Sequence, residues 1–373
     1  MKNRIRQSVV VVLMVSASVA LAKGGGGGQS IPPRRATPPP PGGHVVAPSA
    51  VRAETQQELV FGGPVHYQNL SLVPVLTSRQ GPFQKYTLLE AGLEAKTLEV
   101  RELGADGARR VMRHYRGRLN QQAASYDGDA AQVNAVEVRN SGNYPVYLLG
   151  GEMILGGKQD RIIQGDTIVP NTSKWTRVAV FCVEHGRWSG QNMKFAAGKA
   201  LAHVALRQAA LTGEQGKVWA EVSAKNRQQG TSNATDTYRR TIQNERVRGK
   251  IAPYREHIVK LLPGDKRLAG MIFAINGKIR VADLFGNPVL FGDVRDKLLS
   301  AYILEALGQQ VDRSAAPISA KAAKGFIDAG RKAKRMAAPS SGRSKNYKLE
   351  DNQLVGGETT DNGAKVRETY MSK

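Results

Sequence analysis

The chain has 373 residues, of which 41% are hydrophobic and 23% charged, so it can bury a sizeable core and wholesale disorder is excluded. Its single cysteine, Cys182, excludes an intrachain disulfide framework and any cysteine-rich metal or iron–sulfur site. The 54 lysines and arginines against 31 acidic residues give a formal net charge of +23, which either favours anionic partners or serves solubility alone.

The first 22 residues have the parts of a secretory signal peptide: three basic residues near the start, an apolar run over 9–19 and small residues at 20–22. A retained anchor is the weaker interpretation, because this run is shorter than the roughly 20 residues that span a bilayer. We therefore expect cleavage after Ala22 and a periplasmic or secreted protein with no transmembrane segment in the mature chain. A nucleic-acid partner is not expected for an exported protein.

Residues 23–50 form a Gly/Pro-rich linker in which half of the residues are glycine or proline. The glycine run over 24–28 is typical of a flexible coil, and the proline run over 38–41 is typical of a stiff polyproline segment. This segment cannot form a core, so we interpret it as a tether to the body that follows.

The body is expected over residues 51–307, and its first part alternates short apolar runs with turn residues about every ten positions. This pattern is typical of antiparallel β-structure, and it predicts a sandwich-like layer. A short helix is expected over 86–95. The predicted strands lie at 69–76, 98–103, 133–138, 146–149, 162–169 and 178–183.

The middle of the chain is predicted to be helical. The Ala-rich stretch 194–211 predicts a helix that ends at Gly213, and further helices are expected over 218–224 and 238–262, the last interrupted at Pro253. Two apolar runs joined by Asn276–Gly277 then predict a β-hairpin with a type I′ turn, followed by a helix over 293–307. The fold class is therefore α+β.

The C-terminal part begins with residues 308–345, a stretch rich in alanine, lysine and serine that we interpret as a basic insert or linker, loosely packed. A basic helix over 321–336 is the alternative. Residues 346–373 contain two expected terminal strands, at 347–354 and 364–370, which would return to the domain.

Several known chemistries lack their motifs here. The sequence has no G-x-S-x-G, S-x-x-K or H-E-x-x-H motif and no histidine pair at metal-ligand spacing, so neither a metal nor a cofactor is expected. A phosphate-binding loop around Lys158 fails as well, because Gln159 stands where Ser or Thr must bind magnesium and Glu152 where the first glycine belongs.

Two segments, GGEMILGGKQDR at 150–161 and FCVEHGRW at 181–188, place polar and charged residues beside apolar runs. The pair resembles the signature of the ARPP family, the ARG and Rhodanese-Phosphatase-superfamily-associated protein domain. The chain departs from the commoner pattern at Gly157, often Ala, and at Asp160, often Asn. The family is functionally uncharacterised, so the resemblance implies a coherent domain over roughly residues 68–307, with the terminal strands left open, and a site without a named reaction. The matching residues are Gly151, Glu152, Gly156, Lys158, Gln159, Arg161, Pro170, Cys182, Val183, Glu184, Gly186, Arg187 and Trp188.

Each candidate residue has a structural alternative. Cys182 is either an inert core side chain or a nucleophile, with His185 as the nearest base, and Glu152 is either a general acid or base or a member of a salt-bridge network. Trp188 stacks on a ligand ring or closes the core where the strand ends. Asp283 is interpreted as a turn- or helix-capping residue.

The resulting hypothesis is an exported protein that binds a small anionic ligand in one polar pocket. Two alternatives stay open: a hydrolytic or transferase enzyme that uses Glu152 or Cys182, and an envelope interaction protein that contacts anionic polymers through its proline linker and basic tail. The pocket is expected to be lined by Glu152, Lys158, Gln159, Arg161, Glu184, Arg187 and Trp188.

Overall fold

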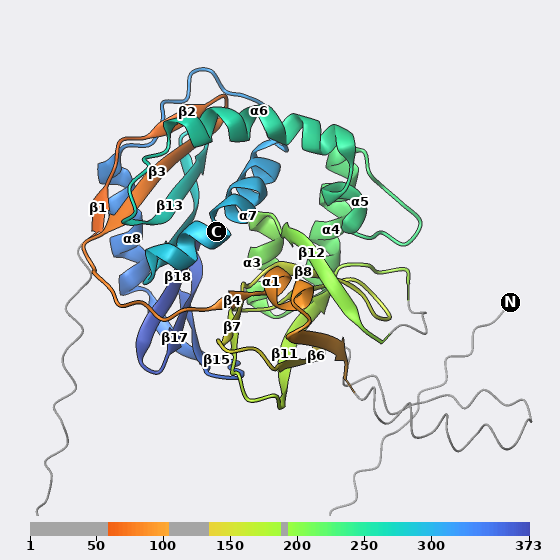
Figure 1. Cartoon of the computed structure of the whole chain (residues 1–373). Helices are drawn as coiled ribbons and strands as arrows, with labels where there is room; N and C mark the ends of the chain where they lie inside the picture. The colour runs from red at the N-terminus through yellow and green to blue at the C-terminus, as the bar shows by residue number, and fades with distance from the viewer. Residues whose placement is uncertain (1–58, 104–133, 188–192) are drawn as a thin grey trace, which may run out of the picture. The chain divides into compact units, whose positions relative to one another are not determined.

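The computed structural model describes residues 59–103, 134–187 and 193–373 of the chain (Figure 1). The predicted signal peptide, the Gly/Pro-rich linker and Trp188 lie outside the described residues. Helix accounts for 30% of the described residues and strand for 38%, and the sheets are mostly antiparallel, so the predicted α+β class is confirmed. None of the described helices is long and apolar enough to cross a membrane.

The largest sheet has nine strands, all paired antiparallel, in the order β1-β3-β13-β14-β18-β17-β16-β15, with β2 paired to β3. It joins the N-terminal, middle and C-terminal parts of the body. The strands are β1 (Leu59–Phe61), β2 (Val65–Tyr67), β3 (Leu70–Thr77), β13 (Leu268–Ile275), β14 (Lys278–Phe285), β15 (Lys334–Ala338), β16 (Ser344–Glu350), β17 (Leu354–Asp361) and β18 (Ala364–Ser372).

A six-stranded sheet has the order β12-β8-β9-β11-β6-β5, and a three-stranded sheet has the order β10-β7-β4. Valine, leucine and isoleucine side chains from these two sheets share one buried cluster, so they pack face to face as the predicted sandwich-like layer. The strands are β4 (Thr87–Leu88), β5 (Leu98–Glu102), β6 (Ala135–Asn140), β7 (Val146–Leu148), β8 (Glu152–Gly156), β9 (Arg161–Ile163), β10 (Thr167–Val169), β11 (Trp175–Cys182) and β12 (Phe195–Leu201).

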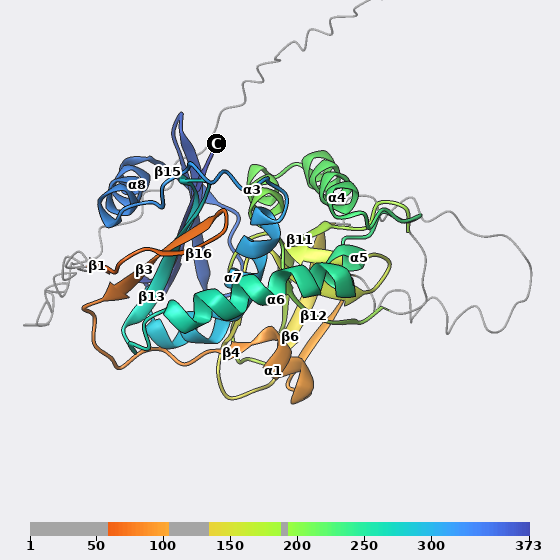
Figure 2. The same cartoon turned by 90° about the horizontal axis from the view of Figure 1, so that it is seen from above.

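Helices cover the remaining faces. On the nine-stranded sheet, alternate side chains of β13 face opposite ways: Phe273 stacks on Tyr302 of one helix, α7, while Ile272 shares a buried cluster with Ile327 of another, α8. The two helices therefore lie on opposite faces of this sheet (Figure 2). Helices α3 and α4 cover the outer face of the six-stranded sheet. The helices are α1 (Leu89–Glu94), α3 (Val204–Thr212), α4 (Gln215–Gln229), α5 (Arg239–Ile242), α6 (Glu245–Leu261), α7 (Pro288–Ala306) and α8 (Ala320–Lys332).

The predicted hairpin is confirmed. Strands β13 and β14 pair on either side of Asn276 and Gly277, whose φ angles of 47° and 72° are the positive values that a type I′ turn requires. The following helix begins earlier than predicted, at Pro288, because Asn287 caps it: its side chain accepts hydrogen bonds from the amides of Val289 and Leu290.

Two further helix predictions differ from the structure, one in where the helix starts and one in where it is interrupted. Residues 195–201 form strand β12 instead of the start of a helix, because they pair antiparallel with β8 and complete the six-stranded sheet. Pro253 does not interrupt α6, which runs through it from Glu245 to Leu261. Tertiary pairing outweighs local propensity in the first case.

Residues 308–345 are better ordered than a loosely packed linker. They contain α8, which approaches the sheet through the buried side chains of Ala323 and Ile327, and β15, which pairs with β16. Ser319 caps α8 by accepting a hydrogen bond from the amide of Ala322. The alternative interpretation, a basic helix over 321–336, is close to what is observed. The expected terminal strands belong to β16, β17 and β18.

Candidate functional site

The signature segment 150–161 folds as two paired strands, β8 and β9, with a tight turn between them. The turn needs glycine at two positions, because Gly156 and Gly157 have φ angles of 121° and 53°. A Cβ atom on Gly157 would lie 2.3 Å from Cζ of Phe195. This compact turn brings the residues that follow it, Gln159 and Asp160, against the second signature segment.

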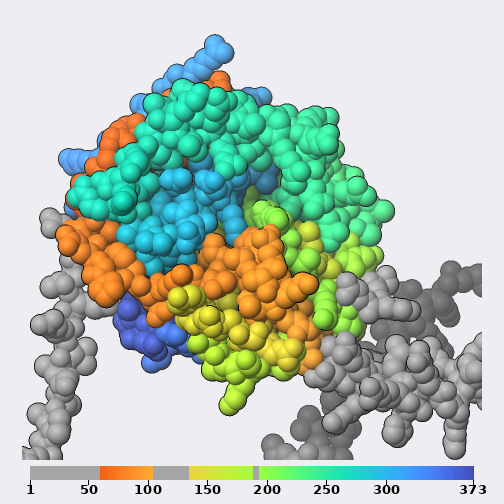
Figure 3. All heavy atoms as spheres, viewed as in Figure 1, coloured from red at the N-terminus to blue at the C-terminus, as the bar shows by residue number. Residues whose placement is uncertain are grey.

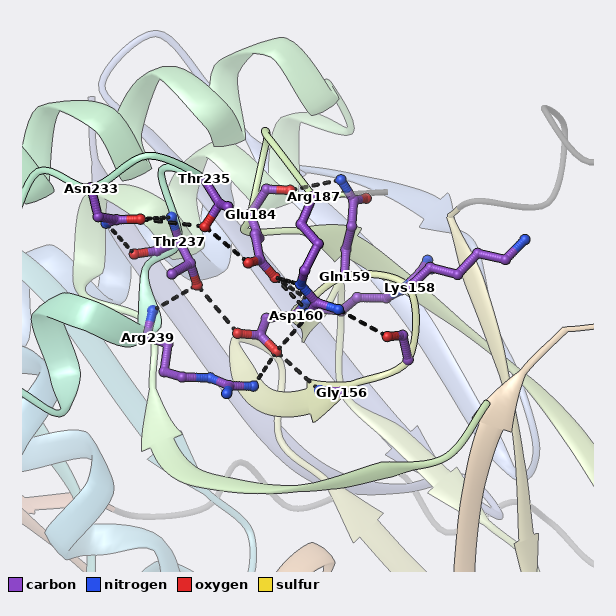
Figure 4. Close-up of polar contacts among 12 residues, drawn as sticks. Gly156, Lys158, Gln159, Asp160, Glu184, Arg187, Asn233, Thr235, Thr237 and Arg239 are labelled. Carbon is purple, nitrogen blue, oxygen red and sulfur yellow. Dashed lines mark hydrogen bonds and ion pairs between the residues drawn. The ribbon is translucent and has the colours of Figure 1, made fainter. Parts of the chain in front are cut away.

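Asp160 is the centre of the contacts that hold the turn. Its carboxylate accepts hydrogen bonds from the amide of Gly156 at 2.9 Å, from Thr237 Oγ1 at 3.2 Å and from Arg239 Nη2 at 2.6 Å. Asp160 is 1% exposed, so these three donors replace the water that a carboxylate otherwise requires (Figure 4). Asp160 departs from the commoner family pattern, and no sequence pattern predicts this role for it.

Glu184 receives donors from both signature segments. Its carboxylate accepts from Arg187 Nε at 2.8 Å, from the amide of Asp160 at 3.2 Å and from Thr235 Oγ1 at 3.0 Å. Burial disfavours its ionised form, but the hydrogen bonds from Arg187 and Asp160 prevail and hold the pKa of Glu184 below its ordinary value. Glu184 is therefore ionised at neutral pH and structural in its contacts.

Three more of the predicted pocket residues, Gln159, Arg161 and Lys158, also donate hydrogen bonds within the fold. Gln159 Nε2 donates to the carbonyl oxygen of Glu184 at 2.7 Å, and the fully buried Arg161 donates to both carboxylate oxygens of Glu102, at 3.0 and 2.9 Å. The amide of Lys158 donates to Glu102 as well, at 2.8 Å, while its side chain points away from the Asp160–Glu184 contacts (Figure 4). The structure thus brings Gln159, Glu184 and Arg187 together as a frame.

Glu152 lies in a separate cluster with Lys297 of α7 and Glu90 of α1. Lys297 forms an ion pair with Glu152 and donates to Glu90 Oε2 at 2.6 Å, and the amide of Leu149 donates to Glu152 at 3.2 Å. Burial and the nearby charge of Glu90 raise the pKa of Glu152 to about 7, although Lys297 opposes the shift. The two carboxylates hold the pKa of Lys297 above its ordinary value despite its burial.

Lys297 also lines a groove of about 890 Å³ between α6, α7 and β12, which we call the α6–α7 groove. The surface is hollowed between these two helices (Figure 3). Its lining combines apolar side chains such as Leu201, Ile251 and Leu304 with six cationic and two acidic residues: Lys199, Arg248, Arg255, Lys260, Arg295 and Lys297 against Glu256 and Asp296. Apart from the link through Lys297 to Glu152, sequence patterns gave no signal for this groove.

Cys182 is fully buried at the end of β11, and burial raises the pKa of its thiol. Its backbone amide and carbonyl are both bonded to the side chain of Gln215, at 3.0 and 2.8 Å. These features favour core packing over nucleophilic chemistry. His185, named as its nearest base, packs edge-on against Trp219 with ring centroids 4.4 Å apart.

Asp283 does not cap a turn or a helix, so that interpretation is wrong. It lies within β14, fully buried, and accepts two hydrogen bonds from Arg207, at 3.1 and 2.8 Å. Arg367 forms an ion pair with the same carboxylate. No group of three or more His, Cys, Asp or Glu side chains in the described ranges is arranged to hold a metal ion.

A family model described as the ARG and Rhodanese-Phosphatase-superfamily-associated Protein domain matches residues 58–371. The match confirms the resemblance seen in the signature segments and extends it past residue 307 to the last strand. No curated protein and no solved structure matches the chain.

Proposed function

Because the chain belongs to the ARPP-1 family, whose domain takes in both walls of the α6–α7 groove, we propose that this groove binds a small anionic ligand. The observation that carries the proposal is the charge of the groove. Its six cationic residues face Glu256 and Asp296 in the lining and pair with Glu90, Glu94 and Glu152 beside it, so positive charge stays in excess and Arg248 lies outside these ion pairs. Positive side chains set among apolar ones attract anions more strongly than the same charges do in open water.

Lys297 is the residue that connects the groove with the signature segment. It is 16% exposed at its side chain, and it is held between Glu90 and Glu152. An anion in the groove competes with these two carboxylates for the ammonium group. Since Glu152 has a pKa of about 7, protonation of Glu152 removes one competitor, and binding should strengthen as the pH falls below 7.

Three of the predicted pocket residues have a positioning role in this proposal. Gln159, Glu184 and Arg187 fix the turn that follows β8, and Glu152 is the first residue of that strand. The paired contacts of these residues argue against a ligand site among them. The ligand-binding residues we propose are therefore Lys297 and Arg248, with Glu152 behind them.

Isothermal titration calorimetry of the chain from Lys23 onward, with sulfate, pyrophosphate and ATP as probes, tests the proposal. We expect saturable binding of at least one probe, weakened about tenfold by Lys297→Met or Arg248→Met, because a charge-assisted hydrogen bond contributes about 1.5–3 kcal/mol. The matched control is Lys217→Met, an exposed lysine on α4 outside the groove, which should bind as the wild type does.

Sulfate also serves as the pH probe, because its charge does not change between pH 6 and pH 8. It should bind more tightly at pH 6, and Glu152→Gln should abolish this difference. The proposal fails if none of the three anions binds, or if the groove variants and the Lys217 variant lose affinity equally.

A second candidate, hydrolytic or transferase chemistry, is favoured by one observation. A carboxyl with a pKa of about 7 can both accept and donate a proton at neutral pH, as a general acid or base requires. If Glu152 is catalytic, Glu152→Gln abolishes turnover of phosphate or acyl esters while Cys182→Ser keeps it. Equal activity in the wild type and the Glu152 variant would exclude the role.

We further propose that the protein is exported and cleaved after Ala22, so that its ligand is met outside the cytoplasm. The proposal is supported by the basic, apolar and small-residue order of positions 1–22. Mass spectrometry of the protein purified from producing cells should give a mature N-terminus at Lys23. An intact Met1 N-terminus in the native protein would contradict export by this route.

A further inference from the structure

A second cavity, of about 920 Å³, lies between the C-terminal strands of the nine-stranded sheet and the sandwich-like layer. We call it the inter-sheet cleft, and it shares no lining residue with the α6–α7 groove. Its walls come from β17, β18, the β15–β16 turn, the start of β11 and the end of α3. Figure 1 shows where β15, β17 and β11, which contribute lining residues, lie in the fold. The volume is within the range of small-molecule sites.

The charges at the base of the cleft cancel. Arg207 and Arg367 line it, and Arg367 Nη1 donates to Asp166 Oδ1 at 2.6 Å. Both arginines form ion pairs with Asp283, so two cations face two carboxylates, and all four residues are at most 6% exposed. An anionic ligand would have to separate these pairs at a large desolvation cost, so the base of the cleft favours a neutral ligand. The other charged lining residues are Arg177, which is exposed, Lys348, which pairs with Glu350, and Glu358, which pairs with Arg335.

The base of the cleft is polar as well as buried. Arg367 Nε is buried and has no hydrogen-bond partner among the described residues, although the rest of its guanidinium is paired. Further lining comes from hydroxyl and amide side chains that can both donate and accept: Gln164, Thr167, Ser340, Asn346, Thr359 and Thr369.

Two half-buried aromatic residues, Trp175 and Tyr347, line the cleft from opposite sheets. Each ring is held by an arginine: the guanidinium carbon of Arg101 lies 3.7 Å from the Trp175 centroid, and that of Arg335 lies 3.2 Å from the Tyr347 centroid. Rings fixed in this way lose little conformational freedom on binding. They suit a ligand with apolar C–H faces as well as hydroxyl groups.

We propose that the inter-sheet cleft binds a neutral oligosaccharide. Sugars combine what the lining calls for: no net charge, many hydroxyl groups that donate and accept, and C–H faces that pack on aromatic rings. The proposal does not rest on the anion groove, because the two cavities share no lining residue.

The test is a calorimetric titration of the chain from Lys23 onward with cellotriose, maltotriose and chitotriose. We expect at least one of them to bind saturably, with an affinity that high salt leaves unchanged because the ligand is uncharged. Tyr347→Ala should weaken binding about tenfold. Gln164→Ala is the second variant; it alters a half-buried lining side chain whose removal leaves the packing of the sheets intact, and it should weaken binding as well.

Tryptophan emission gives an independent readout. The chain has three tryptophans, and Trp219 packs on His185 outside the cleft. Sugar binding should change the emission of the wild type and of Trp219→Phe, but not that of Trp175→Phe. The proposal is overturned if none of the three sugars binds, if Tyr347→Ala and Gln164→Ala bind as the wild type does, or if Lys297→Met is the variant that loses binding.

Discussion

Asp160 shows how much of the signature segment depends on one carboxylate. Replacing it by alanine leaves the Gly156 amide and Thr237 without their acceptor and Arg239 without its closest ion-pair partner. We expect Asp160→Ala to lower the free energy of unfolding by about 3 kcal/mol, measured by urea denaturation, because several donors lose one acceptor that is 1% exposed.

The matched control for Asp160 is Asp328→Ala. The side chain of Asp328 is 43% exposed and pairs with Lys324 one turn away on α8, so its loss should change stability by less than about 0.5 kcal/mol. If the two variants lose similar amounts of unfolding free energy, Asp160 does not organise the turn between β8 and β9.

Glu152 gives the protein a predictable pH dependence. Its pKa rises from an ordinary 4.5 to about 7 in the folded chain, so between these values the folded state holds a proton that the unfolded state has released. Stability should therefore fall as the pH rises from about 4.5 to 7 and then level off, by up to about 3 kcal/mol. Urea denaturation at pH 5 and pH 8 measures this loss.

In Glu152→Gln the loss of stability between pH 5 and pH 8 should disappear, because the amide does not titrate. The control is Glu94→Gln, which changes an exposed carboxylate on α1, the helix that contains Glu90. Glu94 pairs with Lys199, and its replacement should leave the pH dependence of stability as in the wild type. Parallel pH profiles for the wild type and the Glu152 variant would contradict the shifted pKa.

At the scale of elements, α8 is the segment whose packing most needs a test, since its composition resembles a linker. Gly330 makes its close approach possible: a Cβ atom there would lie 2.3 Å from Cδ1 of the buried Tyr370 ring. Gly330→Ala should cost about 1–3 kcal/mol in unfolding free energy, because the helix or the ring must move.

Gly325 lies on the same helix with no atom within 4 Å of a Cβ placed there. Gly325→Ala should therefore stabilise the protein by up to about 1 kcal/mol, through helix propensity alone. Both variants are compared by urea denaturation. If the two substitutions have the same effect, α8 does not pack against β18 as described.

Element predictions succeeded where local chemistry decides the structure. The Asn276–Gly277 turn requires two positive φ angles, and Asn287 followed by Pro288 is a helix start, so both features are local in origin. The strand character of residues 195–201 was missed because it comes from pairing with β8, some 40 residues earlier in the chain. Sequence periodicity contains no information on such a partner.

At the scale of the whole molecule, the α+β class and the sandwich-like layer could be predicted, but the nine-stranded sheet could not. It joins strands from residues 59–77, 268–285 and 334–372, and pairing over such separations has no short-range signal. Of the predicted pocket residues, Gln159, Glu184 and Arg187 form one frame, whereas Glu152 lies in another cluster with Lys297 and Glu90. Sequence patterns do not predict this division, because Lys297 and Glu90 approach Glu152 only in the folded chain.

The buried Arg367 links the nine-stranded sheet with the three-stranded sheet, and its replacement tests how much this link stabilises the fold. It lies on β18, 3% exposed, and it pairs with Asp283 of β14 and with Asp166 beside the three-stranded sheet. Arg367→Met keeps much of the side-chain volume but leaves two buried carboxylates with one arginine fewer. We expect a loss of about 3–5 kcal/mol at pH 7, the usual cost of breaking a buried ion pair from one side.

The pH dependence of that loss identifies its cause. Burial opposes ionisation of Asp283, but Arg207 and Arg367 hold its pKa far below the ordinary 3.8, so the stabilisation is complete above that pH and is lost as the pH falls below it. The difference between the wild type and Arg367→Met should therefore narrow below about pH 4. Arg267→Met, which removes an exposed pair with Asp265, should stay close to the wild type throughout. If Arg367→Met loses as much stability at pH 3 as at pH 7, lost packing and not charge connects the two sheet systems.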